Sequence, residues 1–499
     1  MGLLDWIVLF VYFLMLLSIG LWAYFKVKDS ADFYTAGGKL PWWLSGISHH
    51  VSGYSGAVFV AYAGIAYTHG FTLYVWWAFT VGLSTLIAAC YIAPRWSRLR
   101  LYAGIQSPTE YLLMRYDLPT QQLIAWIGTI IKIFDTGGKL AAIAVLLNVF
   151  SGTSITTGIL LVGVVSLIYI TIGGLWADVW NDFGQFIVQI LAGITMFVMI
   201  LFKLGDGASG VFTLWEKLPP ANSGFFHEPY TIMFALVMLM INFFSYSGGT
   251  WNLATRFIST SSGETARKAA ILSSILYFTW PLILLYPMFA TPIFFENLAD
   301  PSVSYGMMVL EFLPSGLVGL VLASLFANTL SMTASDSNTV SAVISRDILP
   351  VVFPFLKTYS KAKLLKIARI TTLTFTVLTI FTGLNSTYFG GVFGLIISWF
   401  AALLGPIAIP MILGLLPTFA KSNGKVAIIS IVSGLLTFAI LKVFPTQSLA
   451  LEIGMPTMVS FVMFVSGGYL LNEKVPSKVN DLLSNISKIT ISNEHDVLN

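Results

Sequence analysis

The sequence contains a single cysteine, Cys90, among 499 residues. One thiol cannot form an intramolecular disulfide, and it cannot supply the several sulfur ligands of a zinc or iron–sulfur site. Charge is also scarce, because Asp, Glu, Lys and Arg make up 10% of the chain, whereas soluble domains carry about 25%. The chain therefore has too few charged side chains to cover a soluble protein of this size.

Motifs of several other functional classes are missing. The net charge of +4 is small and no basic run occurs, so we expect no nucleic-acid partner. We find neither a His-Glu-x-x-His zinc motif nor a Gly-x-Ser-x-Gly nucleophile motif at a strand-to-helix turn, so we expect no enzyme. The first 25 residues lack a basic start and form too long an apolar run for a signal peptide, so we expect a retained first span.

Apolar residues dominate instead, at 57% of the chain, with a mean hydropathy of +0.84. A bilayer core needs about 20 apolar residues per helix. This length predicts about thirteen spans, which begin near Leu4, Pro41, Phe71, Thr120, Thr156, Phe183, Glu228, Lys268, Met307, Leu364, Gly391, Lys425 and Pro456. The runs are continuous rather than alternating, so the chain is predicted to be an all-α polytopic membrane protein and not a β-barrel.

The Lys and Arg residues predict the orientation. With the N-terminus outside, 21 of the 26 basic residues fall in predicted cytoplasmic segments, Arg256 among them, as the positive-inside rule requires. The C-terminal tail, residues 472–499, is then cytoplasmic. We expect a location in the plasma membrane, and the low charge and absent disulfides suit a bacterial inner membrane.

Two predicted spans are poor lipid-facing helices. The second contains Gly46, Gly53, Gly56 and Gly64 with several serines, and the seventh contains the run Ser247–Asn252. Non-helical backbone at membrane depth survives only where it lines a cavity or is buried in protein. The alternative is that these small residues only allow close helix packing.

These two spans open comparable stretches of five spans each. An odd number of spans per repeat places the two halves in opposite orientations, which is typical of secondary transporters with a site at mid-membrane. We therefore divide the chain into a leading helix and loop (1–40), a first repeat (41–204), a second inverted repeat (228–416), two trailing helices (417–471) and the tail (472–499).

Polar and charged residues also lie within spans. The ninth is rich in hydroxyl and amide side chains between Asn328 and Ser341, whose oxygens suit a small hard cation, although helix-to-helix hydrogen bonds explain most of them. Lys132, Asp135 and Lys139 share one helical face, so Asp135 can pair with either lysine. A self-neutralised structural cluster and a transport role both fit this pattern. Asp182 and Asp336 are interpreted as lining an aqueous exit path or as solvated helix ends.

Three segments resemble the sodium:solute symporters, the family of sodium–sugar, proline, pantothenate and sialic acid carriers. The stretch 171–189, TIGGLWADVWNDFGQFIVQ, resembles the family signature. The segment 33–43, FYTAGGKLPWW, is similar to the entry into the first core helix, and 331–348 resembles the Ser/Thr-rich eighth core helix. The resemblance implies the inverted five-plus-five fold, with one leading and two trailing helices, and inward solute movement driven by a sodium gradient.

The resemblance also implies a sodium site between the first and eighth core helices. Carried over by motif, the ligands are backbone carbonyls of Val51, Tyr54 and Asn328, the Ser331 hydroxyl and the side chain at 332. Position 332 is Met rather than Ser or Thr, so the site loses a ligand or uses Ser52, Ser335 or water. Asp182 matches the family aspartate near the sodium exit. Sodium is the only ion expected, with no other cofactor.

The solute is less well defined. Gly53, Val58 and Trp77 occupy the positions of polar sugar contacts in sodium–galactose relatives, so the chain is not simply a galactose carrier. Besides Tyr54, the predicted solute-binding residues are those near the two interrupted spans: His49, His50, Ser52, Ser55, Trp76, Trp77, Ser247, Trp251 and Asn252. Aromatic faces beside polar donors suit a polar small solute. The alternative for the histidines is a structural role in the core, with their hydrogen bonds made inside the protein. The alternative for Trp76 and Trp77 is a place in the aromatic belt at the membrane interface.

Together these features predict sodium-coupled symport of a small polar organic solute, with a sugar, polyol or sugar acid favoured. A proton-coupled carrier on the same fold, favoured by Met332 and His50, and a transporter-like membrane sensor are the alternatives. We expect the partners to be the solute, sodium and the bilayer, and the protein to be a monomer or a weak oligomer.

Overall fold

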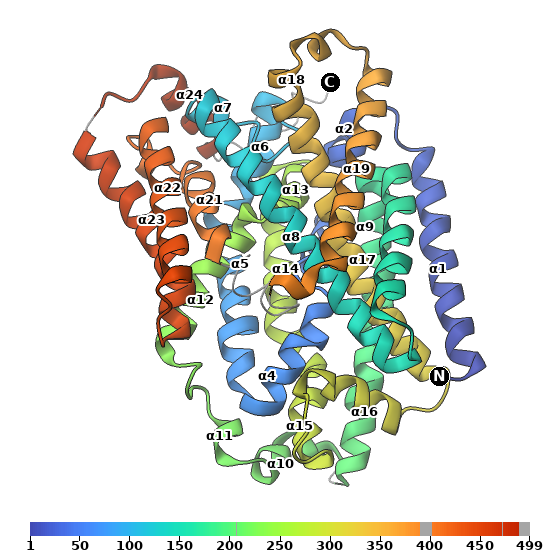
Figure 1. Cartoon of the computed structure of the whole chain (residues 1–499). Coiled ribbons are helices and arrows are strands. Elements are labelled where there is room, and N and C mark those ends of the chain that lie inside the picture. The colour runs from blue at the N-terminus through green and yellow to red at the C-terminus, as the bar shows by residue number, and fades with distance from the viewer. Residues whose placement is uncertain (206, 390–401, 472, 489–499) are drawn as a thin grey trace.

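A computed structural model describes residues 1–205, 207–389, 402–471 and 473–488. The long helices run roughly along one direction, and short helices cap both ends (Figure 1). The α-helices are α1 (Leu3–Tyr24), α2 (Ser30–Thr35), α3 (Trp42–Val51), α4 (Ala61–His69), α5 (Thr80–Tyr91), α6 (Ala93–Ala103), α7 (Leu112–Arg115), α8 (Leu118–Ser151), α9 (Ile155–Leu204), α10 (Gly210–Lys217), α11 (Pro220–Ser223), α12 (Ile232–Phe244), α13 (Asn252–Ile258), α14 (Gly263–Leu284), α15 (Tyr286–Phe294), α16 (Ser304–Phe312), α17 (Leu317–Val343), α18 (Leu349–Val352), α19 (Lys361–Leu384), α21 (Ala402–Leu413), α22 (Gly424–Val443), α23 (Leu449–Leu471) and α24 (Ser477–Ser487).

Several helices begin where a polar side chain caps the first turn. Asp117, Ser154, Thr231, Ser262 and Ser360 each accept a hydrogen bond from a backbone N–H of the helix that follows. Such caps satisfy N–H groups that have no partner within the helix. These helix starts are therefore marked in the local sequence.

Nine helical stretches within the described residues are long and apolar enough to cross a membrane. The predicted span from Pro41 is not among them, because it is divided into α3 and α4. The ninth span starts later than expected: α16 covers Met307, and α17 begins only at Leu317, after Pro314 and Gly316 with its φ of 94°. The span predicted from Gly391 begins outside the described residues, and α21 is its later part.

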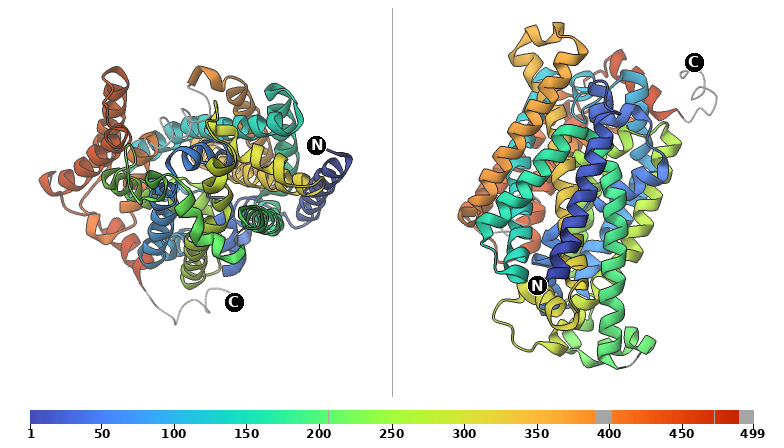
Figure 2. Two further views of the ribbon diagram at one scale, coloured as in Figure 1. Left: turned by 90° about the horizontal axis from the view of Figure 1, so that it is seen from below. Right: turned by 90° about the vertical axis from the view of Figure 1, so that its right-hand side faces the viewer.

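Helix α17 forms the centre of the molecule, and 89% of the residues in its most apolar 18-residue stretch are buried. It packs against α1, α8, α9 and α19, whereas α22 and α23 pair on the opposite flank (Figures 1 and 2). Because α17 is buried all round, its many hydroxyl and amide groups must find partners inside the protein.

The two predicted interrupted spans are both interrupted. The first consists of α3, a non-helical stretch with a 3-10 turn η2 (Gly56–Phe59), and α4. The second consists of α12, a π-helical segment η5 (Ser245–Gly249), and α13. The turn η2 of the first break and α13, which follows the second break, both pack against α17, so the breaks place backbone polar groups inside the helix bundle.

Candidate solute and ion sites at the helix breaks

The first break is held by two tyrosines from other helices. The Tyr277 hydroxyl of α14 donates to the carbonyl of His50 (2.9 Å), and the Tyr246 hydroxyl of η5 donates to the carbonyl of Gly53 (2.6 Å). A Cβ at Gly53 would lie 1.7 Å from Tyr277 Oη, so only glycine fits there. The carbonyls released from the helix are thus partly satisfied by side chains.

The second break carries backbone conformations that side chains rarely adopt. Gly248 has a φ of 118°, and Trp251 has a φ of 67°. Positive φ at a large residue is a true outlier and persists only where the surroundings enforce it. Next to Trp251, Asn252 Nδ2 donates to the carbonyl of Ser52 (3.2 Å), so the two breaks are joined directly.

A cavity lies between the breaks and is lined by both interrupted helices, by α8, α17 and α21, and by the π-helical segment η3 (Tyr74–Phe79). Its wall residues are Gly53, Tyr54, Ser55, Val58, Tyr62, Trp77, Asp135, Lys139, Met238, Ile241, Asn242, Ser245, Tyr246, Thr250, Leu253, Met332 and Leu404. The Trp77 ring meets Tyr54 and Tyr62 edge-on, at centroid distances of 5.9 and 4.9 Å. Mostly apolar and aromatic walls with a few polar groups are typical of small-molecule sites.

A fully buried arginine lies beside the first break. Arg256 Nη2, from α13, contacts Asp178 Oδ2 (2.6 Å) and Asp182 Oδ2 (3.2 Å), both on α9. The same nitrogen donates to Ser52 Oγ (3.0 Å) and to Ser335 Oγ. We call Arg256, Asp178 and Asp182 the arginine cluster. Its groups carry one positive and two negative charges when ionised.

The arginine cluster reaches the polar face of α17 through a serine. Ser331 Oγ donates to Asp182 Oδ1 (2.5 Å) and lies 3.2 Å from Ser52 Oγ. Ser52 Oγ also lies 3.1 Å from Ser335 Oγ. Hydroxyl oxygens from α17 and from the first break thus converge on one carboxylate.

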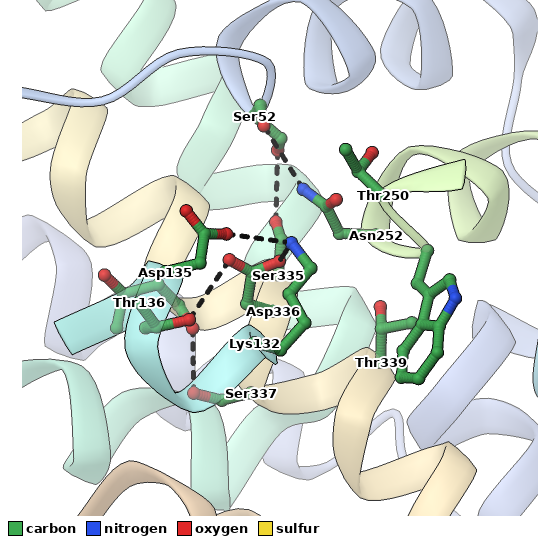
Figure 3. A network of polar contacts seen from close by, with 12 residues as sticks. Ser52, Lys132, Asp135, Thr136, Thr250, Asn252, Ser335, Asp336, Ser337 and Thr339 are labelled. Carbon is green, nitrogen blue, oxygen red and sulfur yellow. Dashed lines mark hydrogen bonds and ion pairs between the residues drawn. The ribbon is translucent and has the colours of Figure 1, made fainter. Parts of the chain in front are cut away.

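A second buried cluster joins α8 to α17, and Figure 3 shows most of it. Lys132 Nζ contacts Asp135 Oδ2 (3.1 Å) and Asp336 Oδ1 (2.7 Å). Lys139 Nζ contacts Asp135 Oδ2 (2.6 Å) and Asp336 Oδ2 (2.9 Å). We call these four residues the lysine cluster. Two ammonium groups face two carboxylates, as a buried charge network requires if it is to be stable.

The comparison with known families decides the identity. The model of the "Sodium:solute symporter family" matches residues 33–434. The chain belongs to this family. Among similar proteins is the sodium/sialic acid symporter NanT of Aliivibrio fischeri, which is 26% identical over 365 residues, covering 70% of each chain. The sodium/glucose cotransporter of Vibrio parahaemolyticus is 25% identical over 383 residues, covering 69% of this chain and 68% of its own.

A solved structure supports the fold of this symporter. A substrate-bound, outward-open sodium-coupled sialic acid symporter superposes with a TM-score of 0.81 at 19% identity, over 94% of this chain and 98% of that one. The predicted all-α, inverted five-plus-five transporter fold is therefore confirmed. The protein is a sodium-coupled solute symporter rather than an enzyme.

The predicted sodium ligands of the symporter come from the first interrupted helix and from α17. Val51 is the last residue of α3, and Tyr54 lies in the break that follows. Asn328, Ser331 and Met332 lie on α17, whose middle faces this break, and Ser331 bonds to Asp182. Met332 lines the cavity between the breaks. The sodium assignments of these residues remain a proposal.

Two predicted solute-binding residues, Ser55 and Trp77, line the cavity together with Tyr54. Ser52 Oγ accepts a hydrogen bond from Arg256 of the arginine cluster, and the Ser52 carbonyl accepts one from Asn252. The remaining residues pack elsewhere among the described elements: His49 against Ser273 and Phe257, His50 against Tyr54 and Tyr277, Trp76 on Tyr230, Ser247 beside Trp96, and Trp251 against Gly128.

Other sequence interpretations need correction. Arg256 is buried in the bundle rather than in a cytoplasmic loop, because two aspartates from α9 neutralise it. Asp336 is 1% exposed and contacts two lysines, so it is not a solvated helix end. Asp182 lies two turns inside a helix that starts near Gly174, not at the span end expected near Phe183. Asp178 is not among the site residues predicted from the sequence. Asp178 and Asp182 are two carboxylates four residues apart in an apolar span, and such a pair requires a cationic partner.

Proposed function

We propose that the protein carries a small polar organic solute, a sugar, polyol or sugar acid, into the cell by alternating access, and that Na⁺ binds between the first break and α17. The solute occupies the cavity between the two breaks. Sodium and solute bind better together than apart, by a coupling free energy of typically about 1–3 kcal/mol.

The charge of the arginine cluster is the observation that carries this proposal. Asp178, Asp182 and Arg256 are all completely buried. One negative charge is left over when all three groups are ionised, and a buried uncompensated charge is unstable without a counter-ion. Ser331 Oγ, which donates to Asp182, still has lone pairs for a cation, and the carbonyls of Val51, Tyr54 and Asn328 complete the proposed oxygen set.

Proton coupling is the second candidate. A proton on one of the two carboxylates would also cancel the excess charge. The thioether of Met332 favours this reading, because sulfur is a poor ligand for a hard cation. The two candidates differ in which ion gradient drives uptake.

The proposal includes the topology inferred from the basic residues. The N-terminus lies outside and the C-terminus inside, in a plasma membrane, and the protein acts as a monomer or weak oligomer. Helix α1 begins at the end of the bundle that carries α10, α11 and α16, whereas α24 lies at the other end (Figure 1), which fits termini on opposite sides.

Solute uptake into proteoliposomes tests the ion. We expect an inward Na⁺ gradient to drive uptake and a pH gradient in sodium-free medium to drive none. Ser331→Ala removes the proposed side-chain ligand and should raise the sodium concentration for half-maximal uptake about tenfold or more, as for a lost hydrogen bond to a charge.

Ser337→Ala is the matched control, because Ser337 is a buried serine of the same helix that bonds to Thr333 and Thr376. Its sodium dependence should stay at the wild-type value. Unchanged sodium activation in Ser331→Ala would overturn the site, and uptake driven by protons alone would overturn sodium coupling.

A further inference from the structure

The lysine cluster forms part of the wall of the solute cavity. Asp135 and Lys139 line the cavity directly, whereas Lys132 and Asp336 are not among the wall residues. Asp135 is 1% exposed. The lysine cluster therefore does not only join α8 to α17. One of its carboxylates and one of its ammonium groups also border the space where a solute would bind.

The carboxylate of Asp135 uses only one of its two oxygens. Both lysines contact Oδ2, at 3.1 and 2.6 Å. No donor within the described part of the chain lies at hydrogen-bond distance from Oδ1. Figure 3 shows this oxygen turned away from Lys132. A buried acceptor without a donor costs free energy, and a ligand that supplies the donor recovers it.

The charges around the cavity restrict what this donor can belong to. The two lysines and two aspartates of the lysine cluster cancel. The excess negative charge of the arginine cluster is cancelled by the coupling cation under the proposed function. A solute with its own net charge would leave that charge unpaired in a buried site, and this is costly.

We propose that Asp135 is a solute-binding residue whose Oδ1 accepts a hydrogen bond from a hydroxyl of an uncharged polyhydroxy solute, and that the neutral wall selects against the corresponding carboxylates. This inference rests on the proposed function, since it takes the cavity as the solute site. It narrows the solute to neutral sugars and polyols and excludes sugar acids.

Matched uncharged and anionic probes test the selectivity. The purified protein is titrated with D-glucose, myo-inositol and D-glucuronate in sodium chloride and in a bulky organic cation at equal ionic strength. We expect sodium-dependent binding of an uncharged probe and at least tenfold weaker binding of D-glucuronate. Tighter binding of D-glucuronate, or no binding of either uncharged probe, would contradict the proposal.

Variants test the residue. Asp135→Asn should weaken binding of the uncharged probe about tenfold or more, because the acceptor loses its charge. Thr136→Ala is the control, since Thr136 bonds to Asp336 (3.3 Å) in the same cluster and is not a wall residue. Its affinity should stay within about threefold of wild type.

The double variant Asp135→Asn with Lys132→Gln separates binding from folding. It keeps the cluster neutral, so thermal stability should return toward the wild-type value while affinity stays low. Recovery of affinity together with stability would show a purely structural role and overturn the proposal. Sodium coupling is judged separately, by the sodium dependence of binding in the wild-type protein.

Discussion

At the scale of single residues, Arg256 joins four side chains in the centre of the molecule. One guanidinium nitrogen contacts two carboxylates and two serine hydroxyls that come from α9, α17 and the first break. Removing the partner of a buried charge usually costs more than the pair contributes, because the remaining charge stays unpaired. Arg256 therefore controls whether Asp178 and Asp182 can remain ionised in the bundle.

Replacing this side chain should destabilise the protein. We expect Arg256→Met to lower the free energy of unfolding by about 3–5 kcal/mol, the range for breaking a buried ion pair. Thermal unfolding of the purified protein measures this. Asp178→Asn added to Arg256→Met removes one of the two stranded charges and should recover part of the loss. Arg267→Met, at an exposed position of α14, should leave stability unchanged, and an equal loss there would contradict the explanation.

At the scale of elements, α9 shows how one residue divides a helix. It runs from Ile155 to Leu204, and its only non-helical residue is Gly174, with φ of 54° and ψ of −147°. Spans were predicted from Thr156 and Phe183, and the division between them lies at Gly174. In the sequence this point carries two glycines, Gly173 and Gly174, and the first charged residue of the helix, Asp178, follows four residues later. The displaced boundary is what places Asp178 and Asp182 inside the second half.

A side chain at Gly174 should disturb this division. A Cβ there would lie 2.6 Å from the backbone oxygen of Phe33, and the conformation itself costs about 1–3 kcal/mol for other residues. We expect Gly174→Ala to lower the unfolding temperature of the purified protein and to reduce uptake. Gly184→Ala is the control on the same helix, where the Cβ would meet the flexible end of Met15 at 3.2 Å and the end of Ile19 at 3.9 Å. Equal behaviour of the two variants would refute the role of the kink.

At the scale of the whole molecule, the two ends of the bundle differ in their elements. Helices α10, α11, α15 and α16 cap one end, and α2, α18 and α24 cap the other (Figures 1 and 2). The basic residues predict that the second end faces the cytoplasm. The family and the fold do not depend on this assignment, so it needs its own test.

Cysteine labelling in intact cells tests the orientation. Cys90 is the single cysteine, so Cys90→Ala gives a background free of thiols. Lys217→Cys, at the end of α10, should react with a membrane-impermeant maleimide from outside, and Lys363→Cys, in the first turn of α19, should react only after permeabilisation. Both native side chains are exposed, so access to solvent does not separate them. The reverse pattern would invert the topology.

The sequence by itself determined the fold class, most of the spans and the two breaks. These properties follow from hydropathy and from glycine, proline and cap residues, which act over a few neighbours. The polar character of α17, the eighth core helix, was also recognisable in the sequence. Ten hydroxyl, amide and carboxyl residues between Asn328 and Ser341 cannot face lipid.

Only the tertiary structure decided which polar groups meet. Helical spacing allowed Asp135 to pair with either lysine, and the structure pairs it with both, adding Asp336 from about 200 residues further along the chain. His49 and His50 are neighbours in sequence, yet Ser273 holds one and Tyr54 the other, and neither lines the cavity. Spacing along a helix gives the direction of a side chain, but its partner comes from whichever helix packs there, and this depends on the whole chain.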